Sequence, residues 1–185
     1  DQNILLIEPV PHNLRLLKKN IEKYKSINIE EVTIGGKTEI KKFYFIKESS
    51  VSKLGKHWAS GIGSFDKQHI INHKTKRFNV TEQDIQSVDI QCLTFNQLVE
   101  KYSITHIDKL QIDVEGAEGL VVEGMQKIIS RCKPYLYIEC SEIGRKTTWT
   151  ILKSLNYSCF KAENKEEVVD FNLYKHNDFI WIPNN

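Results

Sequence analysis

The stretch from Asp108 to Glu118, Asp-Lys-Leu-Gln-Ile-Asp-Val-Glu-Gly-Ala-Glu, constrains the fold more than any other part of the sequence. Apolar and polar residues alternate up to Val114, which is the period of a β-strand. After the glycine, apolar residues recur at the spacing of a helix. The stretch therefore predicts a strand, a tight acidic turn and a helix. In open α/β sheets ligands bind at such strand ends, so Asp113 and Glu115 form a candidate active site.

Length, charge and cysteine usage bound the class of protein. The 185 residues are enough for one domain with a substantial core. Lys and Arg number 26 and Asp and Glu 24, for a formal net charge of +2. Because the charges are dispersed, we expect neither a nucleic-acid partner nor a membrane partner. The cysteines show no C-x-x-C spacing, so we interpret them as reduced and structural and expect a cytoplasmic protein.

Strand and helix patterns alternate along the first half of the chain. Ile4–Ile7 is an apolar run typical of a strand buried on both faces, and prolines after it favour the start of a helix. Ile27–Ile34 and Ile40–Ile46 are predicted strands, joined by a hairpin through Gly35-Gly36. Residues 48–81 lack a regular pattern, which predicts a long, functional loop.

The second half continues the alternation. Thr94 and Gln97 have capping-box spacing, which predicts a helix start there. Because strands alternate with helices, we expect a largely parallel α/β sheet in a single domain over residues 1–185. Two late strands without a helix between them predict an antiparallel C-terminal edge. The remaining predicted strands are Ser87–Cys92, Tyr135–Cys140, Tyr157–Lys161, Val168–Leu173 and Phe179–Ile182.

Acidic residues end three of the predicted strands: Glu8, Asp113 with Glu115, and Glu139. A Rossmann-type site uses an acid at the end of its second strand to bind ribose hydroxyls, and a carboxylate suits a vicinal diol because it accepts two hydrogen bonds. Glu8 fits this role, with a strand pattern before it and a helix after it. A surface glutamate that merely ends a strand fits the same position.

Several of these segments resemble, in order, the FkbM family of methyltransferases. Asp108–Glu118 resembles the most characteristic block of that family, and Ile7–Pro11 resembles its second-strand segment. Weaker resemblances follow in the family's order at Gly61–Phe65, Cys92–Leu98 and Tyr137–Glu139.

The resemblance implies an S-adenosylmethionine-dependent methyltransferase with a Rossmann-like class I sheet. Members of the family typically methylate hydroxyl oxygens on sugars or other small metabolites. Carried over to this sequence, Glu8 would hold the ribose of the cofactor, and Asp113 and Glu115 would face the methyl group and the acceptor. The cofactor would also lie near Gly61, Ser64 and Phe65, although Phe65 fits an apolar anchor equally well.

Two further residues are candidates for contact with the acceptor. Glu139 ends the strand after the acidic stretch, and His69 lies in the irregular segment. For His69, a histidine near the surface is the alternative interpretation.

One part of the family's pattern is missing. The glycine-rich first strand and loop, which cradles the methionine part of the cofactor, should precede Glu8. Gly61-Ile62-Gly63 does not replace it, because it does not join a strand to a helix. We therefore expect the sequence to be a fragment of a longer protein whose upstream strand is missing.

Asp113 is the first candidate for a general base that takes the proton of the acceptor hydroxyl, and Glu115 is the second. Glu118 fits a role in the first turn of the helix. Two other classes stay open. One is a Mg²⁺-dependent phosphoryl-transfer or hydrolytic enzyme with Asp113, Glu115 and Glu139 as oxygen ligands. The other is a non-catalytic binding module on a degenerate methyltransferase fold.

Overall fold

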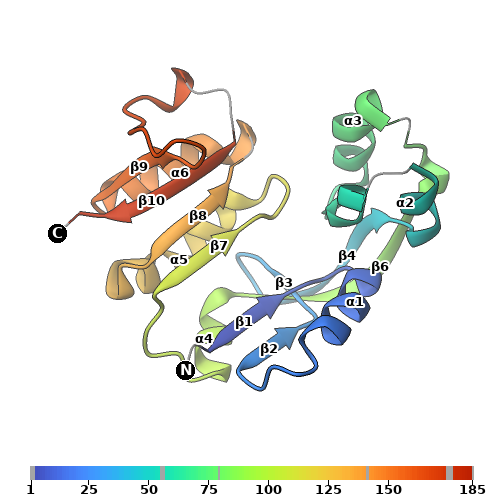
Figure 1. The fold of residues 1–185 in the computed structure, drawn as a ribbon, viewed down its shortest axis with the longest axis horizontal. Coiled ribbons are helices and arrows are strands. Elements are labelled where there is room, and N and C mark those ends of the chain that lie inside the picture. The colour runs from blue at the N-terminus through green and yellow to red at the C-terminus, as the bar shows by residue number, and fades with distance from the viewer. Residues whose placement is uncertain (1–2, 55–56, 79, 141, 174–176, 185) are drawn as a thin grey trace. The chain divides into compact units, whose positions relative to one another are not determined.

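The computed structural model describes residues 3–54, 57–78, 80–140, 142–173 and 177–184. The chain divides into two compact units, residues 1–33 with 38–92 (unit 1) and residues 34–37 with 93–185 (unit 2). Both units combine helices and strands (Figure 1), so the α/β class is confirmed. Whether they fold together as one domain stays a prediction.

The first sheet of unit 1 is a parallel pair. Strand β1 (Ile4–Ile7) lies beside β2 (Ile27–Glu30), from Ile4 opposite Ile27 to Ile7 opposite Glu30. Helix α1 (Pro11–Ile21) connects them and begins with proline at its first turn, as predicted. The expectation that β1 is buried on both faces is wrong for this structure, because Ile4 is 40% exposed and the rest of β1 is half-buried.

A second, four-stranded sheet has the order β3-β6-β4-β5. Its strands are β3 (Thr33–Ile34), β4 (Glu39–Ile46), β5 (Gly63–Ser64) and β6 (Ile85–Leu93). The predicted strand Ile27–Ile34 is therefore two strands in two sheets. The predicted hairpin is also wrong, because β6 lies between β3 and β4. All of β4 pairs antiparallel with residues 85–92 of β6. Local sequence cannot reveal this exchange of partners.

Residues 48–81 are more regular than the predicted loop. They form α2 (Glu48–Leu54), a 3₁₀ helix (His57–Gly61), β5 and α3 (Lys67–Phe78), and a short 3₁₀ helix (Glu82–Asp84) follows. Their apolar residues are too widely spaced to show a period, yet they pack into one cluster with β4 and β6. The buried members are Ile46, Ala59, Ile62, Ile70, Val80 and Ile85.

Unit 2 contains a four-stranded sheet with the order β7-β8-β10-β9. Parallel β7 (Lys109–Ile112) and β8 (Tyr135–Glu139) are followed by β10 (Asp178–Pro183), which is antiparallel to both β8 and β9 (Tyr157–Lys161). The antiparallel C-terminal edge is thus confirmed. The expectation of a mostly parallel sheet is wrong: this sheet is mixed, and in unit 1 a parallel pair, β1–β2, occurs with a sheet in which β4 pairs antiparallel with β5 and β6. The predicted strand Val168–Leu173 is wrong, since its last residues form a 3₁₀ helix, Phe171–Leu173.

Helices α5 (Glu118–Cys132) and α6 (Glu142–Ser154) cover one face of this sheet (Figure 1). The core between them includes Leu136, Ile138, Phe179 and Trp181, all at most 2% exposed. Burying each such side chain stabilises the fold by about 1.5–3 kcal/mol. Alternation along β8 puts Tyr135 and Tyr137, 53% and 39% exposed, on the opposite face.

Helix α4 (Phe95–Lys101) precedes β7 and begins at the predicted capping box. The Gln97 backbone N–H donates to Thr94 Oγ1, and the Thr94 backbone N–H donates to Gln97 Oε1 at 3.0 Å. Such caps typically stabilise a helix by about 1 kcal/mol.

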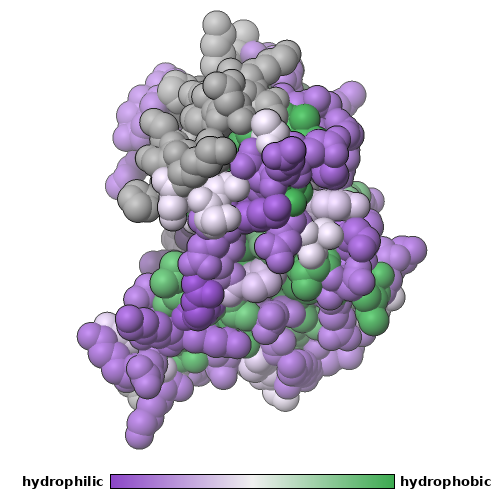
Figure 2. All heavy atoms as spheres, turned by 90° about the vertical axis from the view of Figure 1, so that its right-hand side faces the viewer, coloured by the Kyte–Doolittle hydropathy of each residue, from purple (hydrophilic) through white to green (hydrophobic). Residues whose placement is uncertain are grey.

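Figure 2 shows apolar spots separated by hydrophilic residues on the face that it presents. Among the helices of the described ranges, none combines the length and apolarity needed to cross a membrane.

Candidate functional site

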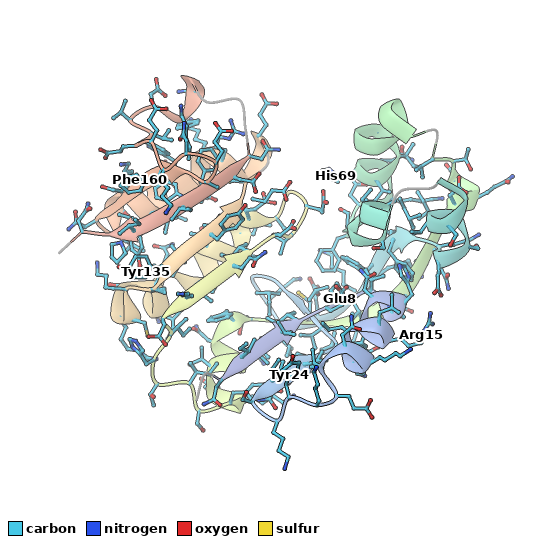
Figure 3. All side chains as sticks on the ribbon, in the orientation of Figure 1. Glu8, Arg15, Tyr24, His69, Tyr135 and Phe160 are labelled. Carbon is cyan, nitrogen blue, oxygen red and sulfur yellow. The ribbon has the colours of Figure 1, made fainter. Side chains whose placement is uncertain are left out.

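Glu8 lies in unit 1 where β1 ends and the chain turns into α1 (Figure 3). Its Oε1 accepts a hydrogen bond from the Val10 backbone N–H at 2.8 Å. Burial raises the pKa of Glu8, and hydrogen bonds from Val10 and from the Asn13 side chain oppose that rise. Glu8 is thus a half-buried acid at a strand end, held in place by the Val10 N–H, and its contact with a ribose stays a prediction.

Asn13, in the first turn of α1, joins the start of that helix to a distant segment. Its Nδ2 donates to the carbonyl oxygen of Ser60 at 2.9 Å, across 47 residues of sequence. Asn13 is also among the groups that lower the pKa of Glu8. Two predicted parts of the cofactor site, Glu8 and the segment that begins at Gly61, are therefore brought together within unit 1. The sequence analysis missed Asn13, although a polar amide in the first turn after a strand-end acid is a signal that could have found it.

Within Gly61–Phe65 the two glycines differ. A Cβ on Gly61 would meet nothing within 4 Å, whereas one on Gly63 would lie 2.5 Å from Cζ of Phe43. Gly63 is therefore needed for close packing of β5 against the Phe43 ring. Ser64 Oγ accepts a hydrogen bond from the Asp66 backbone N–H at 3.1 Å, which helps the chain turn into α3.

The Phe65 side chain is half-buried within unit 1. Its ring meets that of Phe43 edge-on, with centroids 5.4 Å apart, and Lys41 Nζ lies 4.5 Å from the Phe65 centroid. These contacts favour the apolar-anchor interpretation, and stacking on the cofactor stays a prediction. His69 lies in the first turn of α3 and is half-buried (Figure 3). Its contact with an acceptor also stays a prediction.

In unit 2, the predicted acidic turn follows β7. Asp113 is exposed, and the Ala117 N–H donates to the Val114 carbonyl at 3.4 Å to close the turn. The two central residues have positive φ, +50° at Glu115 and +105° at Gly116. This pattern is typical of a type I′ turn, and it explains why a glycine follows the acids.

Glu118 has the helix-start role that the sequence predicts. It is only 1% exposed, and its Oε1 accepts a hydrogen bond from the Gly116 N–H at 2.7 Å. This hydrogen bond therefore joins the acidic turn to the first turn of α5.

Asp113 and Glu139 follow a pair of residues in register, Ile112 on β7 and Ile138 on β8. Parallel strands end at the same edge of a sheet, so both acids lie at one edge of unit 2. Glu115 follows in the adjoining turn. The structure thus brings the three acids predicted for chemistry and acceptor contact to one region.

Tyr137 and Asp178 join this edge and were missed by the sequence analysis. The Tyr137 hydroxyl donates to Asp178 Oδ1 at 2.9 Å. This bond, together with burial and the charges of Asp178, Glu139 and Asp113, raises the pKa of Tyr137. Tyr137 could have been found as the residue two before Glu139, on the same face of a strand. Asp178 comes from β10, whose place beside β8 the sequence does not reveal.

A metal centre formed by Asp113, Glu115 and Glu139 is not assembled. In the described ranges, no three His, Cys, Asp or Glu side chains gather in a way that could hold a metal ion.

A family model described as the methyltransferase FkbM domain matches residues 2–171. The chain belongs to the FkbM methyltransferase family. The crystal structure of methyltransferase FkbM from Methylobacillus flagellatus KT is a similar fold, with 16% sequence identity and a TM-score of 0.49. The match covers 97% of this chain and 36% of that one, so the chain spans about a third of its length. No curated protein matches the sequence.

In this FkbM-family chain, the candidate residues fall into two groups. Unit 1 contains the residues predicted to hold the cofactor, with His69, and unit 2 contains the carboxylates predicted for chemistry, with Glu139. Each group lies within one unit, and the roles of the individual residues stay predictions.

Proposed function

We propose that this FkbM-family chain belongs to an S-adenosylmethionine-dependent methyltransferase that methylates a hydroxyl oxygen on a sugar or another small metabolite. The match of the methyltransferase FkbM domain to residues 2–171 carries the proposal. The parallel pairs β1–β2 and β7–β8 support the further proposal of a Rossmann-like strand order in the whole protein.

The residues of unit 1 fit the nucleoside part of the cofactor. The Val10 N–H fixes one oxygen of Glu8, and a carboxylate can accept several hydrogen bonds, so it has capacity for two ribose hydroxyls. Gly61, Ser64 and Phe65 would flank the nucleoside, since Asn13, in the helix that begins after Glu8, hydrogen-bonds the carbonyl of Ser60 next to their segment. The methionine part would be held by an upstream glycine-rich segment.

The chemistry would take place at the carboxylates of unit 2. Bound S-adenosylmethionine supplies a methyl group that its sulfonium has already activated, so the protein acts chiefly by positioning. Asp113 would accept the proton of the acceptor hydroxyl as general base, with Glu115 as the second candidate. Glu139 and His69 would contact the acceptor.

The cysteines support a further proposal, a cytoplasmic location. All four are free and buried. Burial raises the pKa of Cys140 to about 11 and that of Cys159 to about 12, so these thiols stay protonated and unreactive. Free structural thiols are typical of a reducing compartment.

Calorimetric titration of the full-length protein with S-adenosylmethionine tests the proposal. We expect stoichiometric binding that is weakened by Glu8→Gln and unaffected by Glu31→Gln, a matched change at an exposed glutamate. If the wild-type protein fails to bind, the methyltransferase proposal is wrong and the non-catalytic binding module becomes the better interpretation.

A further inference from the structure

We infer that Tyr137 binds the acceptor by accepting a hydrogen bond from a second polar group of that molecule, and that Asp178 is the positioning residue of Tyr137. The acceptor is then a diol or an amino alcohol, with a hydroxyl or amino group close to the hydroxyl that is methylated, and it has no negative charge. The inference rests on the proposed function and extends it to the class of acceptor.

Tyr137 lies at the same edge of unit 2 as the carboxylates proposed for the chemistry. Side chains alternate along β8, so Tyr137 and Glu139 point to one face of the sheet, opposite the face that α5 and α6 cover. Asp178, on β10, is paired with Glu139. Asp113 directly follows β7, which runs parallel to β8 on its other side. An acceptor that reaches the carboxylates therefore also reaches Tyr137, which is 39% exposed.

The hydrogen bond to Asp178 decides what kind of group Tyr137 can bind. An ionised carboxylate only accepts, so the phenol donates its single proton to Asp178 Oδ1, 2.9 Å away. This bond, with burial and the nearby negative charges, raises the pKa of Tyr137, so the hydroxyl keeps its proton. The phenol oxygen then binds a ligand through its lone pairs alone. The group of the acceptor that meets Tyr137 must therefore be a donor.

The neighbouring charges require an acceptor of the same kind. Asp113, Glu115 and Glu139 are carboxylates, which accept hydrogen bonds when ionised. Arg145 lies on the other face of the sheet, where its Cζ is 5.5 Å from the centre of the buried Phe179 ring. A phosphate or carboxylate group on the acceptor would thus meet like charges, which is costly, whereas hydroxyl and amino groups would find hydrogen-bond acceptors.

The experiment combines protein variants with altered acceptors, using the full-length protein. The acceptors are the methyl glycosides of glucose, galactose and mannose, with their monodeoxy and monoamino derivatives. Glucose 6-phosphate and glucuronic acid are the anionic counterparts. Transfer is measured as release of S-adenosylhomocysteine, and kcat/KM is determined for each acceptor. Thermal denaturation of every variant checks that the fold is kept.

Tyr137→Phe removes the phenol oxygen. In the wild type, one deoxy derivative that is still methylated should have a kcat/KM roughly tenfold lower than the intact glycoside, as for loss of one hydrogen bond. Tyr137→Phe should lower kcat/KM for the intact glycoside by a similar factor and change it little for that deoxy derivative, because both changes delete the same bond. Tyr135→Phe, the same change on the same face of β8, is the control and should match the wild type.

Asp178→Asn and Asp178→Ala test the positioning role. Asparagine keeps a side-chain oxygen that can accept the Tyr137 proton, whereas alanine leaves the phenol able to donate elsewhere. We therefore expect Asp178→Asn to keep the preference for the intact glycoside over the deoxy derivative. Asp178→Ala should reduce that preference several-fold.

Three results would overturn the inference while leaving the methyltransferase proposal intact. The first is that the effects of Tyr137→Phe and of every deoxy substitution multiply independently, as for a pair that only joins β8 to β10. The second is faster transfer to glucose 6-phosphate or glucuronic acid than to the neutral and amino glycosides. The third is a protein that binds S-adenosylmethionine but methylates none of these compounds. A wild-type protein that does not bind S-adenosylmethionine would overturn both.

Discussion

Glu118 accepts a hydrogen bond from the Gly116 backbone N–H at 2.7 Å, and this contact joins α5 to the turn that contains Glu115. The same carboxylate faces Gly144 of α6, where an added Cβ would lie 2.6 Å from Glu118 Oε2. One buried side chain thus links the acidic turn to the first turns of two helices.

Glu118→Ala should destabilise the protein because it leaves the Gly116 N–H without this partner. Loss of such a hydrogen bond typically costs about 0.5–1.5 kcal/mol, and the loss should appear as a lower urea midpoint. Glu123→Ala, at an exposed position of the same helix, is the control and should change stability little. An unchanged midpoint for Glu118→Ala would contradict this role.

Gly144→Ala and Gly124→Ala make the same chemical change in helices with opposite expected results. At Gly144 the new methyl group meets Glu118 Oε2 and, at 3.1 Å, the Gly119 backbone nitrogen. Such overpacking typically costs about 1–3 kcal/mol. At Gly124 nothing lies within 4 Å, so helix propensity should raise the free energy of unfolding by about 1 kcal/mol. Urea denaturation measures both, and equal shifts would show that the close approach at Gly144 is easily relaxed.

Asp113→Asn should abolish methyl transfer while leaving S-adenosylmethionine affinity unchanged, because the amide cannot take a proton from the acceptor hydroxyl. Asp108→Asn, at the opposite end of β7, is the control. Transfer is measured by release of S-adenosylhomocysteine with a panel of sugars and other small hydroxyl compounds. Turnover of Asp113→Asn at the wild-type rate would exclude Asp113 as the base.

Gly63→Ala and Gly61→Ala test the middle glycine segment. The new methyl group at position 63 would displace the Phe43 ring, which packs on Phe65, so the free energy of unfolding should fall by about 1–3 kcal/mol. Position 61 is open and should tolerate alanine. Thermal denaturation compares the two. Titration of the same two variants with S-adenosylmethionine shows whether displacing the Phe43 ring from Phe65 changes cofactor affinity.

The free energy of unfolding should fall in mild acid because of His12, a buried residue of unit 1. Burial lowers the pKa of His12; the charge of Glu48 opposes this shift and that of Arg15 adds to it. Its Nε2 has no hydrogen-bond partner in the described part of the chain. Because the folded-state pKa lies below the ordinary value of about 6.5, the unfolded chain binds the proton more readily. Stability is therefore fully present above that value and falls as the pH drops through it towards the folded-state pKa.

His12→Phe, which keeps a ring against Phe45, should reduce this pH dependence. Urea denaturation at several pH values between about 5 and 8 measures the slope. A slope that His12→Phe leaves unchanged would assign the acid sensitivity to other groups.

Local sequence signals predicted much of what surrounds the candidate residues. The strand before Glu8, the acidic turn, the α4 capping box and the helix after Gly116 each depend on residues close in sequence, where period and capping chemistry are visible. Glu118 was assigned to the helix start for the same reason.

The errors arise where distant segments decide the structure. Nothing within residues 27–46 indicates that β6 separates β3 from β4. The helices of residues 48–81 depend on burial against β4 and β6 rather than on their own pattern. The sequence analysis missed Asn13 and Asp178 because their hydrogen-bond partners, Ser60 and Tyr137, are far away in sequence.

Strand β10 lies between β8 and β9, although it follows both in the chain. Strand β9 therefore cannot join the sheet until residues 178–183 have arrived to bridge it to β8. The sheet of unit 2 is therefore completed by a strand that comes after both of its neighbours in the sequence. Without this one strand, β7 and β8 would stay paired and β9 would lose its partner in the sheet.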